Sequence, residues 1–298
     1  MSTDFCKKHS YRLKSAMLRE INVQQITAKI AEALKSINYA APDELTYALK
    51  QAEKKETAAI AKSTLQKLIE NAQLAKSENI PICQDTGIVE VFVELGQEIH
   101  LVGGDMNSAI NKGIETAYLE LRKSVVGDPL QRTNTKTNTP GIIYTSIVPG
   151  DKLTINVLAK GAGSENKSTL KMFNPTATIQ EIKQFVLQTV KNADAAACPP
   201  FIIGIGIGGS FDYCPLLAKK ALLRKIGKIG TGNNNEQYQK IEHALLQEIN
   251  TLGIGPAGYG GKTTALAVNI ETYPCHIASL PVAVNMQCHV ARHQEIII

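Results

Sequence analysis

Three of the six cysteines occupy positions where a sulfur atom could take part in chemistry. Cys83 opens the polar segment Cys-Gln-Asp-Thr-Gly, and Cys198 directly precedes a Pro-Pro pair at the expected end of a helix. Cys288 closes an apolar run and is followed by a histidine. Side chains at the ends of elements can converge although they lie far apart in the sequence. Spacing alone does not establish a metal site here, because no two cysteines form Cys-x-x-Cys and cysteines are often only small buried apolar residues.

A set of three thiolates would nevertheless have a specific chemical meaning. A 4Fe-4S cluster normally takes four thiolate ligands. With three, one iron keeps an open position and can act as a Lewis acid on a substrate hydroxyl and carboxylate. The other cysteines are less suited to this role. Cys6 lies near the chain terminus, and Cys214 and Cys275 adjoin prolines and are expected to be packing residues.

Two glycine-rich segments suggest nucleotide binding as an alternative. Residues 204–209 fit the pattern G-x-G-x-x-G between an expected strand and an expected helix. A dinucleotide site also needs an acidic residue about 20 positions later, and residues 213–235 contain no Asp or Glu. Residues 261–263 resemble the end of a P-loop, but Pro256 stands where the first glycine belongs and lacks an N–H for phosphate. A nucleotide-binding enzyme built on residues 204–209 is therefore the less favoured alternative.

The segments that must position these residues begin with helices. Residues 21–36 carry apolar side chains at close to 3.6-residue spacing, which predicts a helix. Pro42 fits the first turn of the next helix, because the two acidic residues after it face the positive end of the helix dipole. The pattern continues to about residue 75 and stops before Pro81. We expect a single domain with a helical lead-in at residues 1–80 and a cysteine-bearing core at residues 81–298.

Strands become frequent after Pro81. Short β-branched runs predict strands at residues 88–95, 142–148, 152–158, 201–207, 264–270 and 282–288. A Pro-Gly-Asp turn joins the second and third of these and favours an antiparallel hairpin. Helices are predicted at 106–123, after the capping box of Thr178 and Glu181, at 215–225 and at 235–250. The expected fold class is α+β, an N-terminal helical segment followed by mixed, largely antiparallel sheets flanked by helices.

The composition is that of an ordinary globular protein. The chain has 298 residues, of which 44% are hydrophobic and 20% are charged, so it can bury a large core without disulfides. A net charge of +5 and an aromatic content of 5% give little basis for nucleic-acid binding. The sequence contains no apolar stretch long enough for a membrane helix and no secretory signal. We expect a cytoplasmic protein with reduced cysteines and no nucleic-acid or membrane partner.

Several sequence blocks, in one order from about residue 20 to residue 295, resemble the α subunit of class I (iron–sulfur) fumarate hydratases and the N-terminal domain of the single-chain enzymes. The tartrate dehydratase α subunit is a sister family that shares the three cysteines. The Asp-Pro-Leu tract with its later Asn-Thr-Pro places this chain nearer to fumarate hydratase. The matching blocks are residues 81–87, 122–124, 128–130, 134–135, 138–140, 160–166, 197–200, 204–209, 258–264 and 276–288.

The resemblance implies a 4Fe-4S cluster ligated by Cys83, Cys198 and Cys288, with one iron open to the substrate. A cluster exposed in this way should be sensitive to oxygen. The resemblance further implies Asp85 and His276 as catalytic residues, with Asp85 placed to hydrogen-bond the substrate hydroxyl or the water. The implied substrate-binding residues are Gln84, Arg122, Gly161 and Gly163.

Two of these roles have simpler alternatives. The Arg122 guanidinium suits a substrate carboxylate, but Arg122 could also be a charge on a helix surface. His276 could be a core histidine with its hydrogen bonds satisfied rather than a residue that binds substrate or orients a neighbour.

The implied reaction is the reversible hydration of fumarate to (S)-malate, a step of the tricarboxylic acid cycle. Dehydration of L(+)-tartrate is the alternative. A base must remove the C3 proton, and none of the residues above is an evident candidate. In the single-chain relatives a second domain supplies it. We therefore expect a separate β subunit, in a heterodimer or heterotetramer, and little activity from this chain alone.

Overall fold

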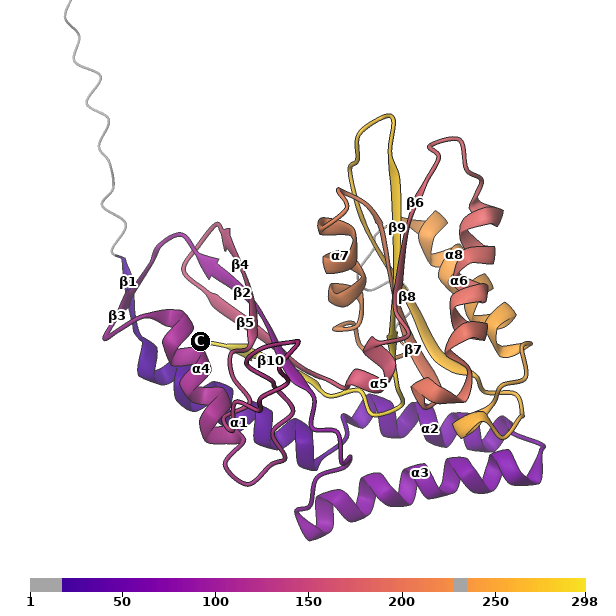
Figure 1. Cartoon of the computed structure of the whole chain (residues 1–298), viewed down its shortest axis with the longest axis horizontal. Coiled ribbons are helices and arrows are strands. Elements are labelled where there is room, and N and C mark those ends of the chain that lie inside the picture. Colours follow the sequence, from indigo (N-terminus) through magenta and orange to yellow (C-terminus); the bar gives the residue numbers. More distant parts are fainter. Residues whose placement is uncertain (1–17, 228–234) are drawn as a thin grey trace, which may run out of the picture.

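The computed structural model describes residues 18–227 and 235–298 and contains two four-stranded sheets that stand side by side (Figure 1). Cys6 lies outside the described residues. Each four-stranded sheet is covered by helices, and two further helices run beneath the second sheet (Figure 1). The predicted α+β class is confirmed.

The N-terminal segment contains the helices α1 (Val23–Tyr39), α2 (Asp43–Lys55) and α3 (Ala59–Glu78). The Asn22 side chain accepts a hydrogen bond from the Gln24 amide at 2.9 Å and so caps the start of α1. The helix α2 begins directly after Pro42, with acidic residues in its first turn and lysines in its last, as the helix dipole favours. Asn79 ends α3 in a left-handed conformation, with φ 52°. The predicted helical segment is confirmed, and α2 and α3 are the helices beneath the second sheet (Figure 1).

The first sheet has the strand order β10-β5-β2-β4 and packs against α1 and α4 (Met106–Ala117). Its strands are β2 (Ile88–Gly96), β4 (Ile142–Val148), β5 (Leu153–Lys160) and β10 (His293–Ile297). Gly113 lets α4 approach α1 closely, because a Cβ at this position would lie 2.8 Å from the Ile30 Cβ. A separate parallel pair consists of β1 (Arg19–Asn22) and β3 (Ile99–Val102).

The expected hairpin of β4 and β5 is wrong, because β2 lies between them. It pairs in parallel with β4 and antiparallel with β5. The end of β2 enters the turn that joins the other two strands. The Gly96 amide donates to Lys152 O at 2.9 Å, and the Gln97 amide donates to Val148 O at 2.8 Å. Since β2 is buried along most of its length, it gains more from a central position than from an edge.

The second sheet has the strand order β6-β9-β7-β8, with α6 and α8 on one face and α7 on the other (Figure 1). Its strands are β6 (Thr169–Phe173), β7 (Phe201–Gly208), β8 (Ala265–Tyr273) and β9 (Leu280–Gln287). Its helices are α6 (Ile179–Ala193), α7 (Tyr213–Ala221) and α8 (Glu236–Asn250). The predicted capping box opens α6, where Thr178 Oγ1 accepts from the Glu181 amide at 3.3 Å and the Glu181 carboxylate accepts from the Thr178 amide at 2.7 Å.

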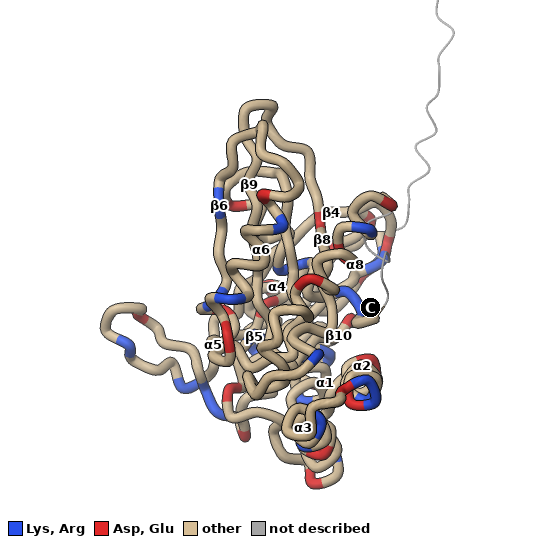
Figure 2. Tube along the Cα trace, turned by 90° about the vertical axis from the view of Figure 1, so that its right-hand side faces the viewer, with Lys and Arg blue, Asp and Glu red and all other residues tan. Residues whose placement is uncertain are grey.

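The described strands form four antiparallel and three parallel pairings, so the sheets are mixed, as predicted. Short helical turns complete the fold: α5 (Ala162–Glu165), η1 (Asp194–Ala197) and η2 (Pro256–Gly258). Figure 2 shows basic and acidic residues interspersed along α2 and α3 rather than gathered by sign. Among the helices of the described residues, none combines the length and apolar character that crossing a membrane requires.

Candidate active site

Two of the three cysteines meet at one end of the second sheet. Cys198 precedes β7, and Cys288 directly follows β9. Because these strands pair antiparallel, with Ile202 opposite Gln287, the start of one lies beside the end of the other. His289 joins the two segments, since its amide donates to Cys198 O at 3.2 Å and its Nδ1 lies 3.0 Å from the same oxygen.

Cys83 reaches the same place from the loop that follows α3. The Ile82 amide donates to Asn38 O at 2.9 Å, and Asn71 Nδ2 donates to Ile82 O at 3.0 Å. Ile82 belongs to a small buried cluster, and the half-buried side chains of Cys83 and Cys288 both pack against it. The helical segment thus delivers the third thiol to the end of the second sheet.

The backbone around Cys198 packs against Ala257 and Gly258, where the glycine-rich block at residues 258–264 begins. Cys198 has φ 56°, a left-handed conformation that non-glycine residues seldom adopt. The Ala257 amide donates to Pro199 O at 2.9 Å and so supports this loop. Gly258 has no room for a side chain, because a Cβ there would overlap the Ala195 Cβ. One role of this block is therefore to hold the loop that presents Cys198.

The Cys83 thiol acts electrostatically on the other two thiols. Burial, and after it the Cys83 thiol, raises the pKa of Cys198. Burial also raises the pKa of Cys288, to which Cys83 adds, while Arg292 and Lys160 act in the opposite direction. Cys83 therefore lies near both other thiols, and all three are free cysteines.

This donor set fits an iron–sulfur cluster better than a single metal ion. Within residues 18–227 and 235–298, no three His, Cys, Asp or Glu side chains are placed to hold one ion. A cluster sets a different requirement, because its thiolates bind separate irons and need not meet at one point. Three free thiols from three segments, beside two buried cations, match that requirement.

The two other described cysteines do not join this set. Cys214 is fully buried, its Sγ donates to Gly206 O at 3.1 Å, and burial raises its pKa to about 11, so it stays a thiol and a packing residue. Cys275 is exposed in the β8–β9 connection, where its Sγ donates to Ser279 O at 3.3 Å. The expectation that Cys275 is a packing residue is therefore wrong.

Asp85 is held in a fixed position beside the thiols. Its Oδ1 accepts from the Gly87 amide at 2.9 Å, and its Oδ2 accepts from the Ala162 amide at 2.8 Å. A Cβ on Gly87 would lie 2.8 Å from the Lys160 carbonyl carbon, and one on Gly161 would lie 3.1 Å from Asp85 Oδ2. These glycines let the two segments approach, and the structure thus brings Asp85 and Gly161 together.

The main chain of Arg122 is anchored to the same loop. Thr86 Oγ1 donates to Arg122 O at 2.6 Å. The buried Asn138 side chain donates to Gly87 O at 3.1 Å and accepts from the Ser124 amide at 2.6 Å. The Arg122 side chain is exposed and forms no ion pair in the described part of the chain. Its guanidinium is thus available to an anionic ligand.

Gln84 and Gly163 complete the group that the fold assembles. Both are exposed. Cys83 Sγ donates to Gln84 Oε1 at 3.4 Å. A Cβ on Gly163 would lie 3.8 Å from Ala196 O, two residues before Cys198. The backbone of Gly163 therefore runs past the Cys198 loop.

The structure does not bring His276 to these residues. It lies in the loop between β8 and β9, which Figure 1 shows at the end of the second sheet far from α2 and α3. The eight residues of β9 separate this loop from Cys288, roughly 26 Å at about 3.3 Å per residue. His276 Nδ1 accepts from the Ala278 amide at 3.1 Å, within the same loop.

Sequence reasoning missed two buried cations beside Cys288. The Lys160 side chain is fully buried, and its Nζ lies 3.4 Å from Glu165 Oε2. Arg292 is 2% exposed, and its guanidinium donates to Asn38 Oδ1 at 3.0 Å. The sequence pointed to these cations only by their positions. Lys160 is the first residue of the block 160–166, and Arg292 follows Cys288 by four residues.

The glycines at residues 204–209 do not form a nucleotide loop. Gly204 and Gly206 lie inside β7 and face α7. A Cβ on Gly204 would overlap the Ala218 carbonyl oxygen, and one on Gly206 would overlap that of Cys214. These glycines let the helix approach the sheet. The nucleotide alternative built on residues 204–209 therefore loses its structural basis.

The Gly-Lys-Thr segment is likewise occupied from within the chain. Glu56 Oε2 accepts from the Lys262 amide at 2.7 Å. Glu56 Oε1 accepts from the amides of Thr57 at 2.9 Å and Ala58 at 3.0 Å. An internal carboxylate thus takes the backbone N–H that a P-loop would offer to phosphate.

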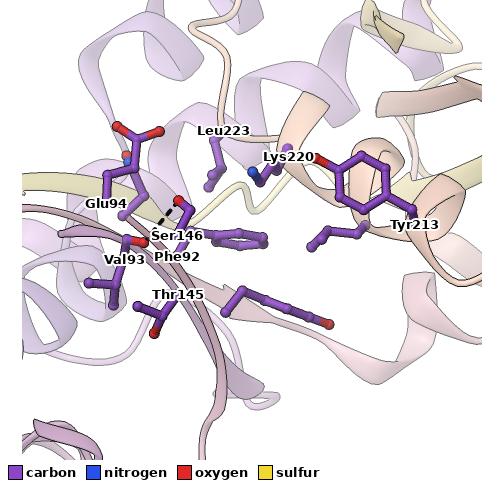
Figure 3. A pocket seen from close by; sticks show the side chains of 11 residues that line it. Phe92, Val93, Glu94, Thr145, Ser146, Tyr213, Lys220 and Leu223 are labelled. Carbon is purple, nitrogen blue, oxygen red and sulfur yellow. Dashed lines mark hydrogen bonds between the residues drawn. The ribbon is translucent and has the colours of Figure 1, made fainter. Parts of the chain in front are cut away.

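A pocket of about 240 Å³ lies between the first sheet and α7 (Figure 3). In Figure 3, Phe92, Thr145 and Ser146 of the sheet stand opposite Tyr213 and Lys220 of α7. None of the predicted site residues lines this pocket. The chemistry of the thiols, rather than the depth of this pocket, therefore locates the candidate active site.

Comparisons with known proteins identify the family of this chain. The fumarate hydratase (Fumerase) family profile matches residues 27–297. A protein of Methanocaldococcus jannaschii, provisionally named L(+)-tartrate dehydratase subunit alpha, is 42% identical over 274 residues, which cover 89% of this chain and 94% of the relative. The L(+)-tartrate dehydratase subunit alpha of Escherichia coli K12 is 30% identical over 292 residues, 95% of each protein. The chain therefore belongs to the fumarate hydratase family of hydro-lyases.

Proposed function

We propose that this chain is the α subunit of an iron–sulfur hydro-lyase that reversibly adds water to a C4 dicarboxylate. The observation that carries the proposal is the convergence of Cys83, Cys198 and Cys288 at one end of the second sheet. These three thiolates would hold a 4Fe-4S cluster. When bound, such a cluster supplies a Lewis-acidic iron with an open position for a hydroxyl and a carboxylate oxygen.

The side chains around the thiols would bind and orient the substrate. The Asp85 carboxylate is fixed by two backbone amides, so it is preorganised to accept a hydrogen bond from water or the substrate hydroxyl. The exposed Arg122 guanidinium suits two-pronged binding of a substrate carboxylate. The Gln84 amide and the backbone at Gly161 and Gly163 would contact the same anion.

A second subunit would complete the site. Lys160 is already paired with Glu165, and both Asp85 oxygens accept from backbone amides, so neither is an evident base for the C3 proton. The relatives are named alpha subunits, which supports a β-subunit partner in a heterodimer or heterotetramer. His276 would contribute only to a site formed with another chain. The free thiols suit a reducing compartment such as the cytoplasm.

Two substrates fit this site, and fumarate is the first candidate. The Asp-Pro-Leu and Asn-Thr-Pro segments within residues 128–140 support it, because they resemble those of the fumarate hydratases. L(+)-tartrate is the second candidate, supported by the names of the relatives.

The test is a substrate panel with the anaerobic α–β complex. Fumarate, (S)-malate and L(+)-tartrate are offered separately, and product formation is followed at fixed cluster content. We expect fumarate and malate to interconvert, and Asp85→Asn to lower kcat by about 10²-fold or more without loss of iron. Asp151→Asn, in an exposed turn, is the matched control. A cluster-loaded complex that converts none of these acids would overturn the proposal, and exclusive turnover of tartrate would replace fumarate as its substrate.

A further inference from the structure

Arg292 is a buried cation in the segment between Cys288 and β10. Its side chain is 2% exposed. One terminal nitrogen donates to Asn38 Oδ1 at 3.0 Å, and Nε is buried without a hydrogen-bond partner. A buried guanidinium normally needs a carboxylate or a comparable anion to offset the loss of its hydration.

No such anion is paired with Arg292 in the described part of the chain. Asp85 lies close by, since a Cβ on Gly161 would be 3.1 Å from its Oδ2 and 3.8 Å from the Arg292 guanidinium. Both Asp85 oxygens, however, are bound to backbone amides. Tyr118 is a neutral phenol, because burial raises its pKa to about 12 and its hydroxyl donates to Thr86 O at 2.7 Å.

The other cation near Cys288 differs in this respect. Lys160 has its own carboxylate partner, Glu165, at 3.4 Å. Its Nζ also donates to Ser164 Oγ at 2.8 Å. Arg292 is thus the buried cation near Cys288 that forms no ion pair in the described part of the chain.

We propose that the missing counter-ion of Arg292 is the iron–sulfur centre that Cys83, Cys198 and Cys288 would hold. This inference rests on the proposed function. A 4Fe-4S core with three thiolates carries a net negative charge, and reduction makes it more negative. A fixed cation beside it therefore retains the cluster and makes its reduction easier. Arg292 is a charge-compensating residue for the cofactor, too buried to contact substrate directly.

The test compares the cluster in four full-length variants after anaerobic reconstitution. Arg292→Gln removes the charge, and Arg292→Lys retains it. Asn38→Asp replaces the amide that binds the Arg292 guanidinium by a carboxylate. This variant keeps the arginine but neutralises its charge. Lys191→Gln, on the exposed face of α6, removes an equal charge at a distance. The readouts are the midpoint potential, followed by electron paramagnetic resonance, and the rate of iron release to a chelator.

We expect Arg292→Gln and Asn38→Asp to shift the redox equilibrium at least tenfold against reduction, about 59 mV for one electron. Iron release should accelerate at least tenfold in both, while Arg292→Lys and Lys191→Gln stay close to wild type. If Arg292→Gln does not fold, Asn38→Asp carries the comparison. Variants that keep the wild-type potential and iron retention would overturn the inference and leave the proposed function standing. A wild-type chain that binds no cluster would overturn both.

Discussion

Replacing Lys219 by methionine should sever the ionic link between the two sheets. Lys219 lies on α7, which packs on the second sheet, and it is ion-paired with Glu90 of β2 in the first sheet. It also lies 2.8 Å from Glu165 Oε1. The Glu90 side chain is completely buried; Lys219 contacts its Oε1, and its Oε2 has no hydrogen-bond partner. Methionine retains the apolar stem of Lys219 and removes only the charge.

The magnitude follows from the burial of Glu90. Removing one partner of a buried ion pair costs about 3–5 kcal/mol, because the remaining charge keeps its desolvation penalty. We expect Lys219→Met to lower the free energy of unfolding by an amount in this range near pH 8. Lys220→Met is the matched control: this neighbouring lysine forms no ion pair in the described part of the chain, and its loss should change stability by no more than about 0.5 kcal/mol.

The loss should depend on pH. Burial raises the pKa of Glu90, while Lys219 opposes the rise. A carboxyl whose folded pKa is raised contributes stability below its unfolded pKa and loses that contribution as pH rises through the folded pKa. Without Lys219 the pKa of Glu90 rises further. A larger fraction of Glu90 is then neutral at pH 5 than at pH 8, so the loss should be smaller at pH 5 than at pH 8.

The assay is urea unfolding of wild type, Lys219→Met, Glu90→Gln and the double variant at pH 5 and pH 8. Coupled partners should show an interaction energy of about 0.5–3 kcal/mol at pH 8. Strictly additive changes, or a Lys219→Met loss below about 1 kcal/mol at pH 8, would refute the reasoning.

Three further substitutions test other parts of the account. Gly206→Ala should lower the free energy of unfolding in urea by about 1–3 kcal/mol without any nucleotide present, because its methyl group would overlap the Cys214 carbonyl oxygen. The control is Gly127→Ala, whose methyl group would lie 3.8 Å from its nearest neighbour and should cause no such loss. Equal losses in the two variants would contradict the packing role of Gly206. Arg122→Gln should raise KM for the dicarboxylate about 10- to 100-fold in the α–β complex while Lys123→Gln does not, and an unchanged KM would remove Arg122 from the site. Glu56→Gln should cost about 1–3 kcal/mol at pH 7. Burial opposes the shift, but backbone hydrogen bonds from Ala58, Lys262 and Thr57 lower the pKa of Glu56. The wild type therefore loses the stability that the ionised Glu56 contributes as pH falls, and its free energy of unfolding should approach that of Glu56→Gln in acid. A stability difference that does not change with pH would contradict this role.

Local signals predicted most elements of the fold. The capping box at Thr178, the acidic residues after Pro42 and the β-branched run of β2 depend on neighbours in the sequence, so the sequence alone predicts them. Pairing between strands is not local. The turn at residues 149–151 indicated a reversal correctly, but the insertion of β2 between β4 and β5 depends on which strand is buried on both faces.

The candidate site was harder to predict from the sequence alone. Cys198 and Cys288 meet because β7 and β9 pair in one register, which spacing cannot reveal, so the ligand set came from a family resemblance. His276 lies at the opposite end of β9 from Cys288, because the whole strand separates the two residues. The glycines of β7 matched a nucleotide motif, because a close helix–sheet contact and a phosphate loop both require the absence of a Cβ. The burial of Arg292 depends on contacts with Asn38, 254 residues away.

Iron and acid-labile sulfide in the anaerobically reconstituted chain test the central claim most directly. Wild type and Cys214→Ser should each contain about four irons and four sulfides and absorb broadly near roughly 400 nm, as expected of a thiolate-held cluster. The single variants Cys83→Ser, Cys198→Ser and Cys288→Ser should each lose the cluster. A colourless wild-type chain, or a cluster that survives in those three variants and disappears in Cys214→Ser, would contradict the account.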